Sequence, residues 1–485
     1  MERYTCCADE MITAMVTKRA ASILNFKATY ARVFRTIWLL TAFSLPLSVK
    51  LYFPVIDLEV VFPAEPMLAL LFLMFIAALA IKFLRPSFVK GFFLAPITMI
   101  VVVLLCCSVL SLVFSAMPLV SAKAVLVQVV FLGVFYFSTA SSLFPDRRTA
   151  WMKAFNLYGA TFVIVAFYAL TVQATEGFDR AGSNRTAYPF FIDHTIYAAA
   201  LTFVLFICAY RAVSSFRHQS ASGERTSLVL LALFCLFAFF LSYCRAAWLA
   251  LAIVLLFVPV LVFRSWRASL LTCFVTGALI VFMAHGQVRS GLPNASEQGA
   301  GIRETLLSMA NTRTDPSNAE RLYRWHGAWR MFKEKPLTGF GPGTFQFEYR
   351  AFQPPVEIIT LSMAGPAHPD RITREWGIGN EVMVRSNPQF MFQSGGTAHS
   401  EYLLALAESG IPYALAFLSL LAVAISMGFR FVLGQARNGR GPVLMALLGL
   451  GAYAVHGVFN NYLDDPKVAF LFWGCIAIIA AHAHD

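Results

Sequence analysis

Charged side chains are scarce in this sequence: 13% of the 485 residues are charged, whereas 58% are hydrophobic. Soluble domains average about 25% charged residues, and disordered segments are poor in large apolar residues. The scarcity of charge therefore excludes a soluble globular enzyme and a disordered tail, and it indicates a protein that lies among membrane lipids.

Acidic residues are scarcer than basic ones, with 26 Asp and Glu against 38 Lys and Arg, and the formal net charge is +12. Such an excess can indicate a nucleic-acid partner. Here, however, the basic residues lie in short loops between long apolar runs, where membrane topology places them. We therefore expect no nucleic-acid partner.

The long polar stretch between about residues 285 and 400 lacks cysteine and lacks an Asp-x-Asp pair. These absences exclude a disulfide framework, a cysteine-based zinc site and a carboxylate pair that would hold a divalent cation for a nucleotide sugar. His399 and Glu401 are two residues apart and would point to different sides of a helix, and no His-Glu-x-x-His motif is present. We expect neither a metal ion nor another cofactor.

The apolar residues gather in runs that are long enough to cross a membrane, since a span needs roughly 20 of them. Polar punctuation divides the chain into about 12 such segments, so the sequence predicts an all-α, polytopic integral membrane protein. The segments are 36–55, 66–83, 92–115, 124–143, 155–175, 194–211, 227–244, 246–263, 268–284, 411–429, 442–461 and 468–483.

Lysine and arginine collect in alternate loops, which places those loops and both termini in the cytoplasm. The expected organisation is a cytoplasmic segment over 1–35, nine spans over 36–284 with a small external loop at 176–193, a large external loop over 285–410 and three spans over 411–485. No internal repeat of the kind found in transporters is visible. The single late insertion favours an enzyme with an external active site.

The large loop is too rich in aromatic residues for a disordered linker, so we expect it to be partly helical. Residues 317–320 spell Ser-Asn-Ala-Glu, a capping box, and apolar residues then recur with a helical period, which predicts a helix over 317–333. Gly339, Gly341 and Gly343 follow. They are typical of tight turns rather than of a dinucleotide loop, because no strand precedes them.

Three ionisable residues lie where a span meets water, a position that is costly and often functional. Arg245 stands between two apolar runs with no room for a loop, and the alternative to a functional role is an interfacial arginine. Arg321 falls in the first turn of the loop helix, where a cation opposes the helix dipole, and the alternative there is a solvated helix face. The third residue is His399.

His399 is expected in the first turn of a helix that Thr397 caps and that runs towards Gly410 and Pro412 at the membrane surface. The positive end of a helix favours an uncharged imidazole, which can accept a proton, and the same end offers N–H groups to an anion. One interpretation is therefore a general base, and the other is a histidine that only caps or hydrogen-bonds locally.

These residues belong to a pattern that resembles the O-antigen ligase/polymerase family of bacterial inner-membrane glycosyltransferases. The pattern is Arg321-x-x-x-Trp325-x-x-Ala328-Trp329, then Pro336-Leu337-x-Gly339-x-Gly341-x-Gly343-x-Phe345, then His399-Ser400-x-x-Leu403-x-x-x-Ala407-Glu408-x-Gly410, with Arg245 and Trp248 and with Arg180-Ala181-Gly182 as shorter elements. The resemblance covers about residues 176 to 430. Cys244, Asp193-His194 and Ser400 stand where the family usually has Ser, Pro-Asn and Asn.

The resemblance implies a GT-C-like fold and a single inverting displacement, without a metal, on the periplasmic face of the inner membrane of a Gram-negative bacterium. The implied donor is an undecaprenyl-pyrophosphate-linked glycan, and the implied acceptor is lipid A-core. Guanidinium groups can meet the charge of a departing pyrophosphate, and a histidine can deprotonate the acceptor hydroxyl. We expect His399, Arg245 and Arg321 to be catalytic. Second-rank candidates for substrate binding are Arg180, Arg185, His194, Arg324 and His456.

Three alternatives remain at the level of sequence. An O-antigen polymerase and a protein O-oligosaccharyltransferase would use the same donor and the same base, because the acceptor is recognised by loop shape. A lipid-linked glycan flippase or another transporter would need charged residues buried along the middle of several spans. In this sequence such residues gather at one external face, which favours the ligase.

Overall fold

The structure is a computed structural model, and it is mostly helical. It describes residues 25–53, 58–80, 95–141, 143–178, 183, 185–263, 316–352, 396–434 and 439–482. Within these residues two short strands form a single sheet, and every other regular element is a helix. The expected segment at 268–284 lies outside the described residues.

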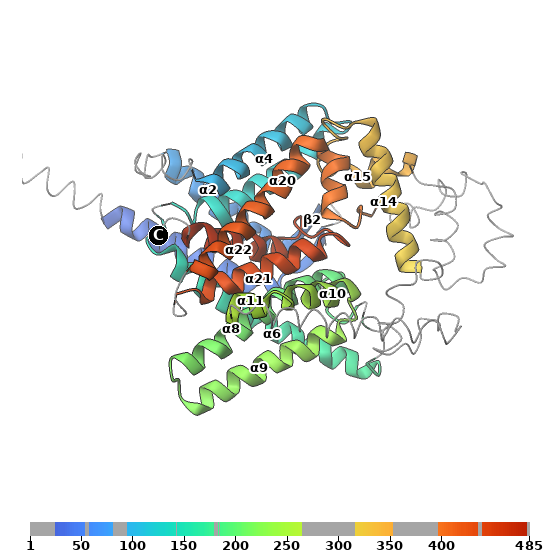
Figure 1. Cartoon of the computed structure of the whole chain (residues 1–485). Helices are drawn as coiled ribbons and strands as arrows, with labels where there is room; N and C mark the ends of the chain where they lie inside the picture. Colours follow the sequence, from blue (N-terminus) through green and yellow to red (C-terminus); the bar gives the residue numbers. More distant parts are fainter. Residues whose placement is uncertain are drawn as a thin grey trace, which may run out of the picture.

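Seven helices of the described chain are long and apolar enough to cross a membrane, and they pack into one bundle (Figure 1). They are α4 (Pro96–Val113), α5 (Pro118–Phe131) with its π-helical continuation η2 (Leu132–Phe137), α6 (Arg147–Thr175), α8 (His194–Arg217), α9 (Ser222–Leu241), α10 (Arg245–Leu255) with α11 (Val258–Phe263), and α20 (Glu401–Gly434). Three shorter apolar helices are α2 (Ala64–Ala80), α21 (Gly441–His456) and α22 (Pro466–His482). The expected all-α, polytopic architecture is confirmed.

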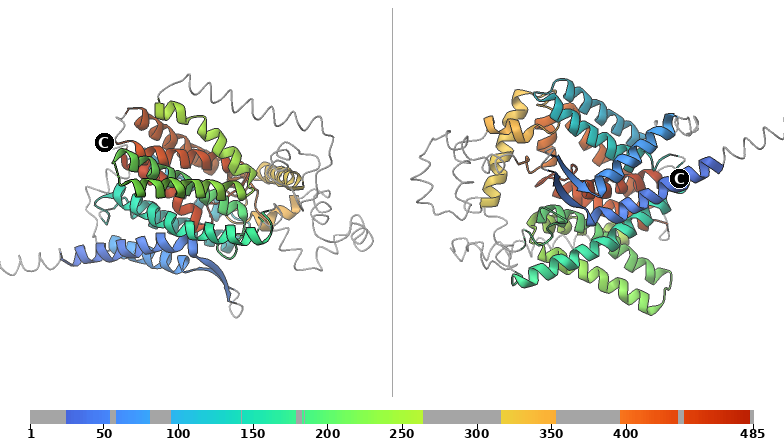
Figure 2. Two further views of the ribbon diagram at one scale, coloured as in Figure 1. Left: turned by 90° about the horizontal axis from the view of Figure 1, so that it is seen from below. Right: turned by 180° about the vertical axis from the view of Figure 1, so that it is seen from behind.

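The first expected span, 36–55, is wrong at its C-terminal end. A helix occupies residues 25–44, so it begins before the boundary placed at residue 36. It ends there because Pro46 cannot continue it and lies in a short 3-10 turn. The apolar residues that follow form β1 (Val49–Phe53), which pairs antiparallel with β2 (Leu58–Phe62). This hairpin lies toward the same end of the bundle as α14 (Figure 2). The β-branched and aromatic residues of this segment favour strands, and they decided its structure rather than the length of the apolar run.

Helix α22 forms the centre of the bundle. Every residue from Val468 to Ala480 is buried, as a helix that is apolar on all sides requires. It contacts α6, α8, α20 and α21. Phe470 packs against Trp151, whose ring in turn meets Trp38 edge-on at a centroid distance of 4.9 Å. The helices that carry candidate site residues are therefore held by one continuous core.

Helix α14 (Pro316–Glu334) lies across one end of the bundle (Figures 1 and 2). The helix expected over 317–333 is thus confirmed, and so are the tight turns, since Gly339, Gly341 and Gly343 all have positive φ. A Cβ at Gly339 would lie 2.2 Å from the carbonyl carbon of Glu408, so only glycine fits there.

The segment after these turns is held against α20. It contains α15 (Phe345–Glu348) and η3 (Tyr349–Phe352). The Glu408 carboxylate accepts hydrogen bonds from the backbone N–H groups of Gly343 and Phe345, both at 2.9 Å. Gly410, with φ of 73°, kinks α20 into a short helix near α14 and a long membrane-spanning helix. The kink presents the start of α20 to the end of the bundle that α14 covers.

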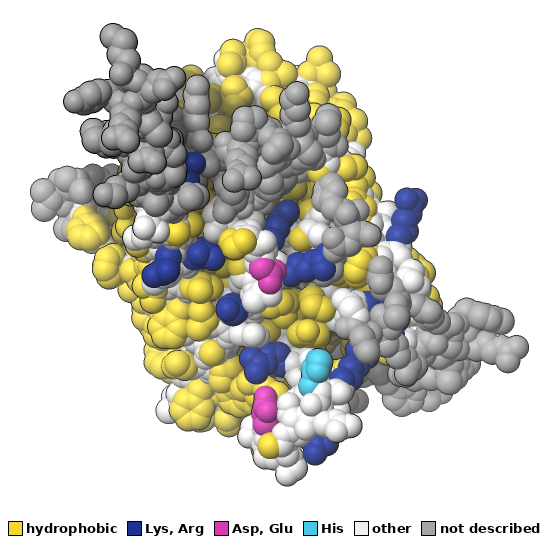
Figure 3. Space-filling view, turned by 90° about the vertical axis from the view of Figure 1, so that its left-hand side faces the viewer, with side chains coloured by type: hydrophobic (Ala, Val, Ile, Leu, Met, Phe, Trp, Pro, Cys, Tyr) yellow, Lys and Arg dark blue, Asp and Glu magenta, His cyan; other side chains and the backbone are white. Residues whose placement is uncertain are grey.

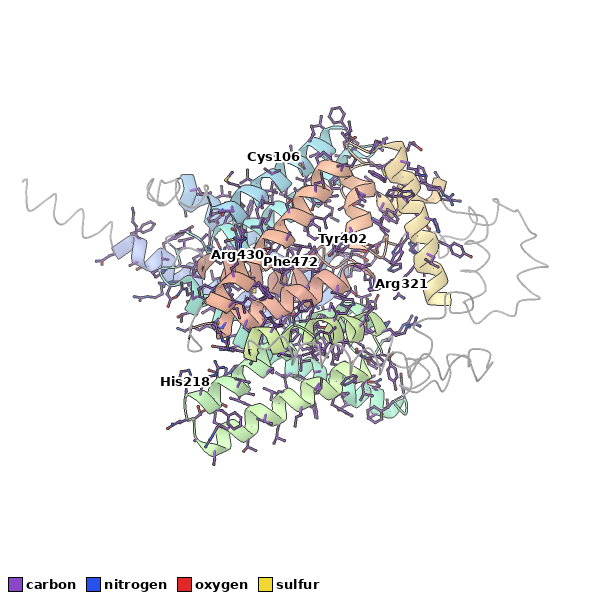
Figure 4. The ribbon with its side chains drawn as sticks, in the orientation of Figure 1. Cys106, His218, Arg321, Tyr402, Arg430 and Phe472 are labelled. Carbon is purple, nitrogen blue, oxygen red and sulfur yellow. The ribbon has the colours of Figure 1, made fainter. Side chains whose placement is uncertain are left out.

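Lysine and arginine side chains gather at the opposite end of the bundle (Figure 3). Figure 4 shows Arg430 and His218 toward that end, whereas Arg321 and Tyr402 lie toward the α14 end. Arg440 is buried and donates to the carbonyl oxygens of Leu261 at 3.0 Å and Val262 at 2.9 Å. Charged side chains are therefore present at both ends of the bundle, and at the basic end one of them, Arg440, bonds the backbone.

Candidate active site

His399 lies just before α20 rather than in its first turn, so the expected position is wrong by a few residues. Ser400 caps the helix by accepting a hydrogen bond from Leu403 N–H at 3.4 Å. The backbone of His399 has φ of 49°, in the left-handed region. That conformation costs a non-glycine residue about 1–2 kcal/mol, and such strain is common at functional sites.

The imidazole ring is fixed through its Nδ1 atom, which lies 2.9 Å from Oδ1 of Asn460. The amide nitrogen of Asn460 donates to Oγ1 of Thr195 at 2.9 Å, so its oxygen is the end that accepts from His399. Nδ1 must then carry the proton, and in the neutral ring the lone pair is on Nε2. The contact chain thus selects the tautomer that leaves Nε2 able to accept a proton.

A carboxylate stands beside Nε2, because Glu320 Oε1 lies 3.6 Å from that atom. The same oxygen accepts from Nε of Arg324 at 3.0 Å, and the other side of the guanidinium donates to the Thr397 carbonyl at 3.2 Å. Burial by itself raises the pKa of the Glu320 carboxyl, but a hydrogen bond from protonated His399 and the charge of Arg324 outweigh it and lower the pKa to about 2. Glu320 is therefore ionised at neutral pH and stabilises an imidazolium.

Helix α14 is docked against the His399 turn by more than this carboxylate. Trp325 Nε1 donates to the His399 carbonyl oxygen at 3.1 Å. Arg324 is buried, and its guanidinium lies over the ring of Tyr349 at 5.6 Å from the centroid. A Cβ at Gly396 would lie 2.6 Å from Nη1 of Arg324, so a larger residue there would displace the guanidinium. We call His399, Glu320, Arg324 and Asn460 the His399 cluster.

A second group of polar residues lies where α14 faces α10 and α21. His456 is buried at the end of α21, and its Nε2 lies 2.9 Å from the Tyr462 hydroxyl and 3.6 Å from Sγ of Cys244. The charge of Arg321 acts on both His456 and Cys244. Burial raises the pKa of the Cys244 thiol to about 11, against a smaller lowering by Arg321. We call Arg321, Cys244, His456 and Tyr462 the Arg321 cluster.

Arg245 is the first residue of α10 and directly follows Cys244 of the Arg321 cluster. Its side chain is buried, with a residue exposure of 8%. A buried guanidinium group needs hydrogen-bond acceptors or an opposite charge nearby, because burial without them is costly. The burial speaks against the alternative of an interfacial arginine that reaches out to water.

The smaller loop contributes less to the described site. Arg180 lies outside the described residues. Arg185 is exposed and makes no side-chain hydrogen bond or ion pair with another described residue. His194 begins α8, with Nδ1 at 3.1 Å from Oδ1 of Asp193, and it precedes Thr195, the partner of Asn460. The charges of Asp193 and His194 also act on His456, so this helix start borders both clusters.

The structure thus brings His399, Arg321, Arg324 and His456 into one neighbourhood, which Asn460 and Tyr462 connect through the short segment after α21. Within the described part of the chain no three His, Cys, Asp or Glu side chains are grouped so that they could hold a metal ion. The chemistry that this arrangement offers is proton transfer at Nε2 of His399 and binding of an anion by guanidinium groups.

Sequence reasoning missed the role of Glu320, which we interpreted as half of a capping box. Its carboxylate instead contacts Arg324 and His399. The spacing of Glu320 and Arg324, four residues apart on one helix face, was a usable signal of an ion pair. No signal in the sequence could show that the Glu320 carboxylate also contacts His399, which lies 79 positions later in the chain.

Comparison with known proteins adds the family. Residues 230–418 match the family model described as O-antigen ligase, a region that includes α10, α14 and the start of α20. Asn460 and Tyr462 lie beyond the matched residues. No curated protein matches the chain significantly. The apolar helices and the family match agree that this is a membrane protein, and residues 230–418 are similar to the O-antigen ligase family.

Proposed function

We propose that this protein is an O-antigen ligase that transfers an undecaprenyl-pyrophosphate-linked polysaccharide to a sugar hydroxyl of lipid A-core. The family in general implies a lipid-linked glycan and a lipid acceptor as substrates. The observation that carries the proposal is the His399 cluster, which holds a histidine in the tautomer of a general base next to a group of arginines.

The reaction is a displacement at the anomeric carbon of the first sugar of the donor. The acceptor oxygen forms a bond to that carbon while the bond from the carbon to the pyrophosphate oxygen breaks, which inverts the configuration. Negative charge grows on the leaving pyrophosphate. Arg321 and Arg245 are the groups that we propose to stabilise this charge, since guanidinium binds phosphate oxygens in pairs and keeps its charge.

The acceptor hydroxyl loses its proton as the new bond forms, and Nε2 of His399 takes it. The product imidazolium then faces the Glu320 carboxylate at 3.6 Å, while Nδ1 keeps its hydrogen bond to Asn460. Arg324 holds Glu320 in place from within the protein, so we propose a positioning role for Arg324 in addition to its expected role in substrate binding. The His399 cluster thus accounts for the proton, and Arg321 and Arg245 account for the charge of the leaving pyrophosphate.

We propose that the α14 end faces the periplasm and that the basic end faces the cytoplasm, in the inner membrane of a Gram-negative bacterium with both chain termini inside. The gathering of Lys and Arg at the end opposite α14 supports this orientation (Figure 3). The proposed domain organisation keeps residues 285–410 as the periplasmic region that carries the site.

The test is reconstitution of the purified full chain with lipid-linked glycan and purified lipid A-core. The expected product is glycan attached to the lipid core, in the presence of a chelator as well as in its absence, because guanidinium groups meet the pyrophosphate charge. A product that grows on the undecaprenyl carrier would instead assign a polymerase, and a product on a protein hydroxyl would assign an O-oligosaccharyltransferase. Loss of the product on chelation would contradict the metal-free mechanism.

A further inference from the structure

A cavity of about 460 Å³ opens beside the His399 turn. Helices α4, α5, α20 and α22 line it, together with the Gly343 turn and the segment after α21. Its size is within the range of small-molecule sites in proteins, roughly 300–1,000 Å³. We call it the α4–α5 cavity.

The cavity has charged and amide side chains near the α14 end, and within the bundle it has apolar side chains together with Ser108, Gln128 and Tyr413, which hydrogen-bond one another. Gln346, Asn461 and Asp464 line it on segments of the α14 end, and Leu104 and Phe131 line it within the bundle. Lys123 and Phe131 are eight residues apart on α5, which corresponds to about 12 Å along the helix axis. The cavity therefore matches an amphiphile whose polar end stays at the α14 end of the bundle.

Two polar groups in the lining point to a ligand. Asn461 has a residue exposure of 8%, and its Oδ1 atom is buried without a hydrogen-bond partner among the described residues. A buried acceptor without a donor costs about 1–3 kcal/mol. Lys123 is exposed near the start of α5 and makes no hydrogen bond or ion pair with another described residue, so its ammonium group is available to an acidic ligand.

Two carboxylates of the cavity wall, those of Glu401 and Glu408, already accept hydrogen bonds from the protein. Glu408 is held by the Gly343 turn, and Glu401 accepts from the backbone N–H groups of Tyr462 at 2.7 Å and Leu463 at 3.1 Å. These bonds fix the wall and leave Asn461, Asp464, Gln346 and Lys123 to meet a ligand. Amide and carboxylate oxygens accept hydrogen bonds from sugar hydroxyls, whereas Lys123 complements an acidic group.

The cavity also shares two backbone segments with the general base. Thr397 lines the cavity and lies two residues before His399, and Asn461 lines it next to Asn460, which holds the imidazole. The Arg321 cluster borders the base from the side of α10 and α21 instead. In an inverting displacement the nucleophile approaches opposite the leaving group, so the acceptor should arrive from a side other than that of the Arg321 cluster.

We propose that the α4–α5 cavity binds the acceptor glycolipid, an inference that rests on the function proposed above. Sugar hydroxyls of the acceptor donate to Asn461 and Asp464, an acidic group of the same lipid pairs with Lys123, and hydrocarbon fills the apolar part near Phe131. The acceptor sugar then reaches Nε2 of His399 past Thr397.

The test measures lipid retention by the full-length protein in native mass spectrometry, with lipid A-core and undecaprenyl pyrophosphate as separate probes. Lys123→Met and Asn461→Leu should each lower the retention of lipid A-core about tenfold, and Ala124→Trp should do the same by filling the cavity. Retention of undecaprenyl pyrophosphate should stay at the wild-type level in all three. Lys153→Met, on α6 outside the cavity, is the matched control and should change neither.

Unchanged retention of lipid A-core in the cavity variants overturns the proposal, as does a loss that affects undecaprenyl pyrophosphate instead. If the wild-type protein retains undecaprenyl pyrophosphate but no lipid A-core, the acceptor site is wrong, while a lipid-linked donor stands. If it retains neither lipid, the proposed function fails as well. Far-ultraviolet circular dichroism of each variant separates lost binding from lost folding.

Discussion

Two buried arginines at opposite ends of this bundle show what separates a structural charge from a candidate functional one. Arg440 donates to two backbone carbonyls of α11 at the basic end. Arg324 donates to the Thr397 carbonyl at the α14 end, and it also holds a carboxylate that faces His399. Both are 2% exposed, so burial alone does not distinguish them.

The difference lies in the partners. The carbonyls that Arg440 bonds cannot change charge, and these two hydrogen bonds join α11 to the start of α21. Arg324 instead belongs to a network in which Glu320 and His399 are titratable and in which one histidine nitrogen faces the carboxylate. A buried charge therefore indicates function here when it supports other ionisable groups, and it indicates structure when it bonds the backbone.

The largest effect is expected for His399→Ala. Transfer should fall by at least about a hundredfold, because removal of a general base costs roughly 10²–10⁴ in rate. The measurement is glycan attachment by the reconstituted protein. His218→Ala removes an exposed histidine toward the opposite end and should leave the rate unchanged. Equal rates for His399→Ala and wild type would remove the base from the mechanism.

The next largest effect is expected at the guanidinium groups. Arg321→Lys and Arg245→Lys should each lower kcat about a hundredfold, since an ammonium cannot reproduce the paired hydrogen bonds to a leaving pyrophosphate. Steady-state kinetics with varied donor measures the change. Arg430→Lys, at the other end of the bundle, serves as the control. An unaltered kcat in either site variant would show that its guanidinium does not meet the developing charge.

A smaller effect is expected when the carboxylate of the His399 cluster is neutralised. Glu320→Gln should lower kcat about tenfold with little change in KM for either lipid, because the imidazolium loses a charged neighbour. Glu320→Asp should restore part of the rate, which a purely structural role would not predict. A rise in KM at constant kcat would assign Glu320 to substrate binding.

At the basic end, Arg440→Leu should change stability rather than chemistry. Two buried carbonyls lose their donor, so the free energy of unfolding should fall by roughly 2–4 kcal/mol, as measured by denaturation in mild detergent. The activity of the folded protein should not change. Arg324→Leu should lower both the free energy of unfolding and the activity of the folded protein. If the two variants had the same effects, the contrast between the two arginines would be lost.

The smallest effect is a difference in acid stability. The pKa of Glu320 is about 2 in the folded protein against an ordinary value of 4.5. A lowered pKa gives stability that is fully present above pH 4.5 and is lost as the pH falls towards 2. The melting temperature of wild type should therefore drop more than that of Glu320→Gln over this window. Parallel curves would contradict the lowered pKa.

Most of the helices could be predicted from the sequence, because runs of apolar residues have to cross the bilayer as helices. The loop helix over 317–333 followed from its cap and its period. The error at 36–55 arose because hydropathy does not distinguish the end of a helix from an apolar strand, and only Pro46 hinted at the break. Hydropathy therefore predicts the existence of a helix better than it predicts where the helix ends.

The candidate site was predictable as residue types but not as contacts. The motif pointed to His399, Arg321 and Arg245. In the structure, Asn460 and Glu320, which the motif did not single out, contact the His399 imidazole. Asn460 is 61 positions away from His399 in the chain. The contact between Asn460 and His399 depends on how α20 and α21 pack. No local sequence pattern shows that two residues so far apart in the chain will meet.

The sequence by itself determined that this chain is a helical membrane protein with a folded insertion, since apolar length and the alternation of basic loops are local properties of the chain. Only the tertiary structure decided which nitrogen of His399 is free to accept a proton, which carboxylate faces it and on which side of it a cavity lies. Those features require side chains from three or four helices within hydrogen-bonding distance, and only packing around α22 brings these helices together.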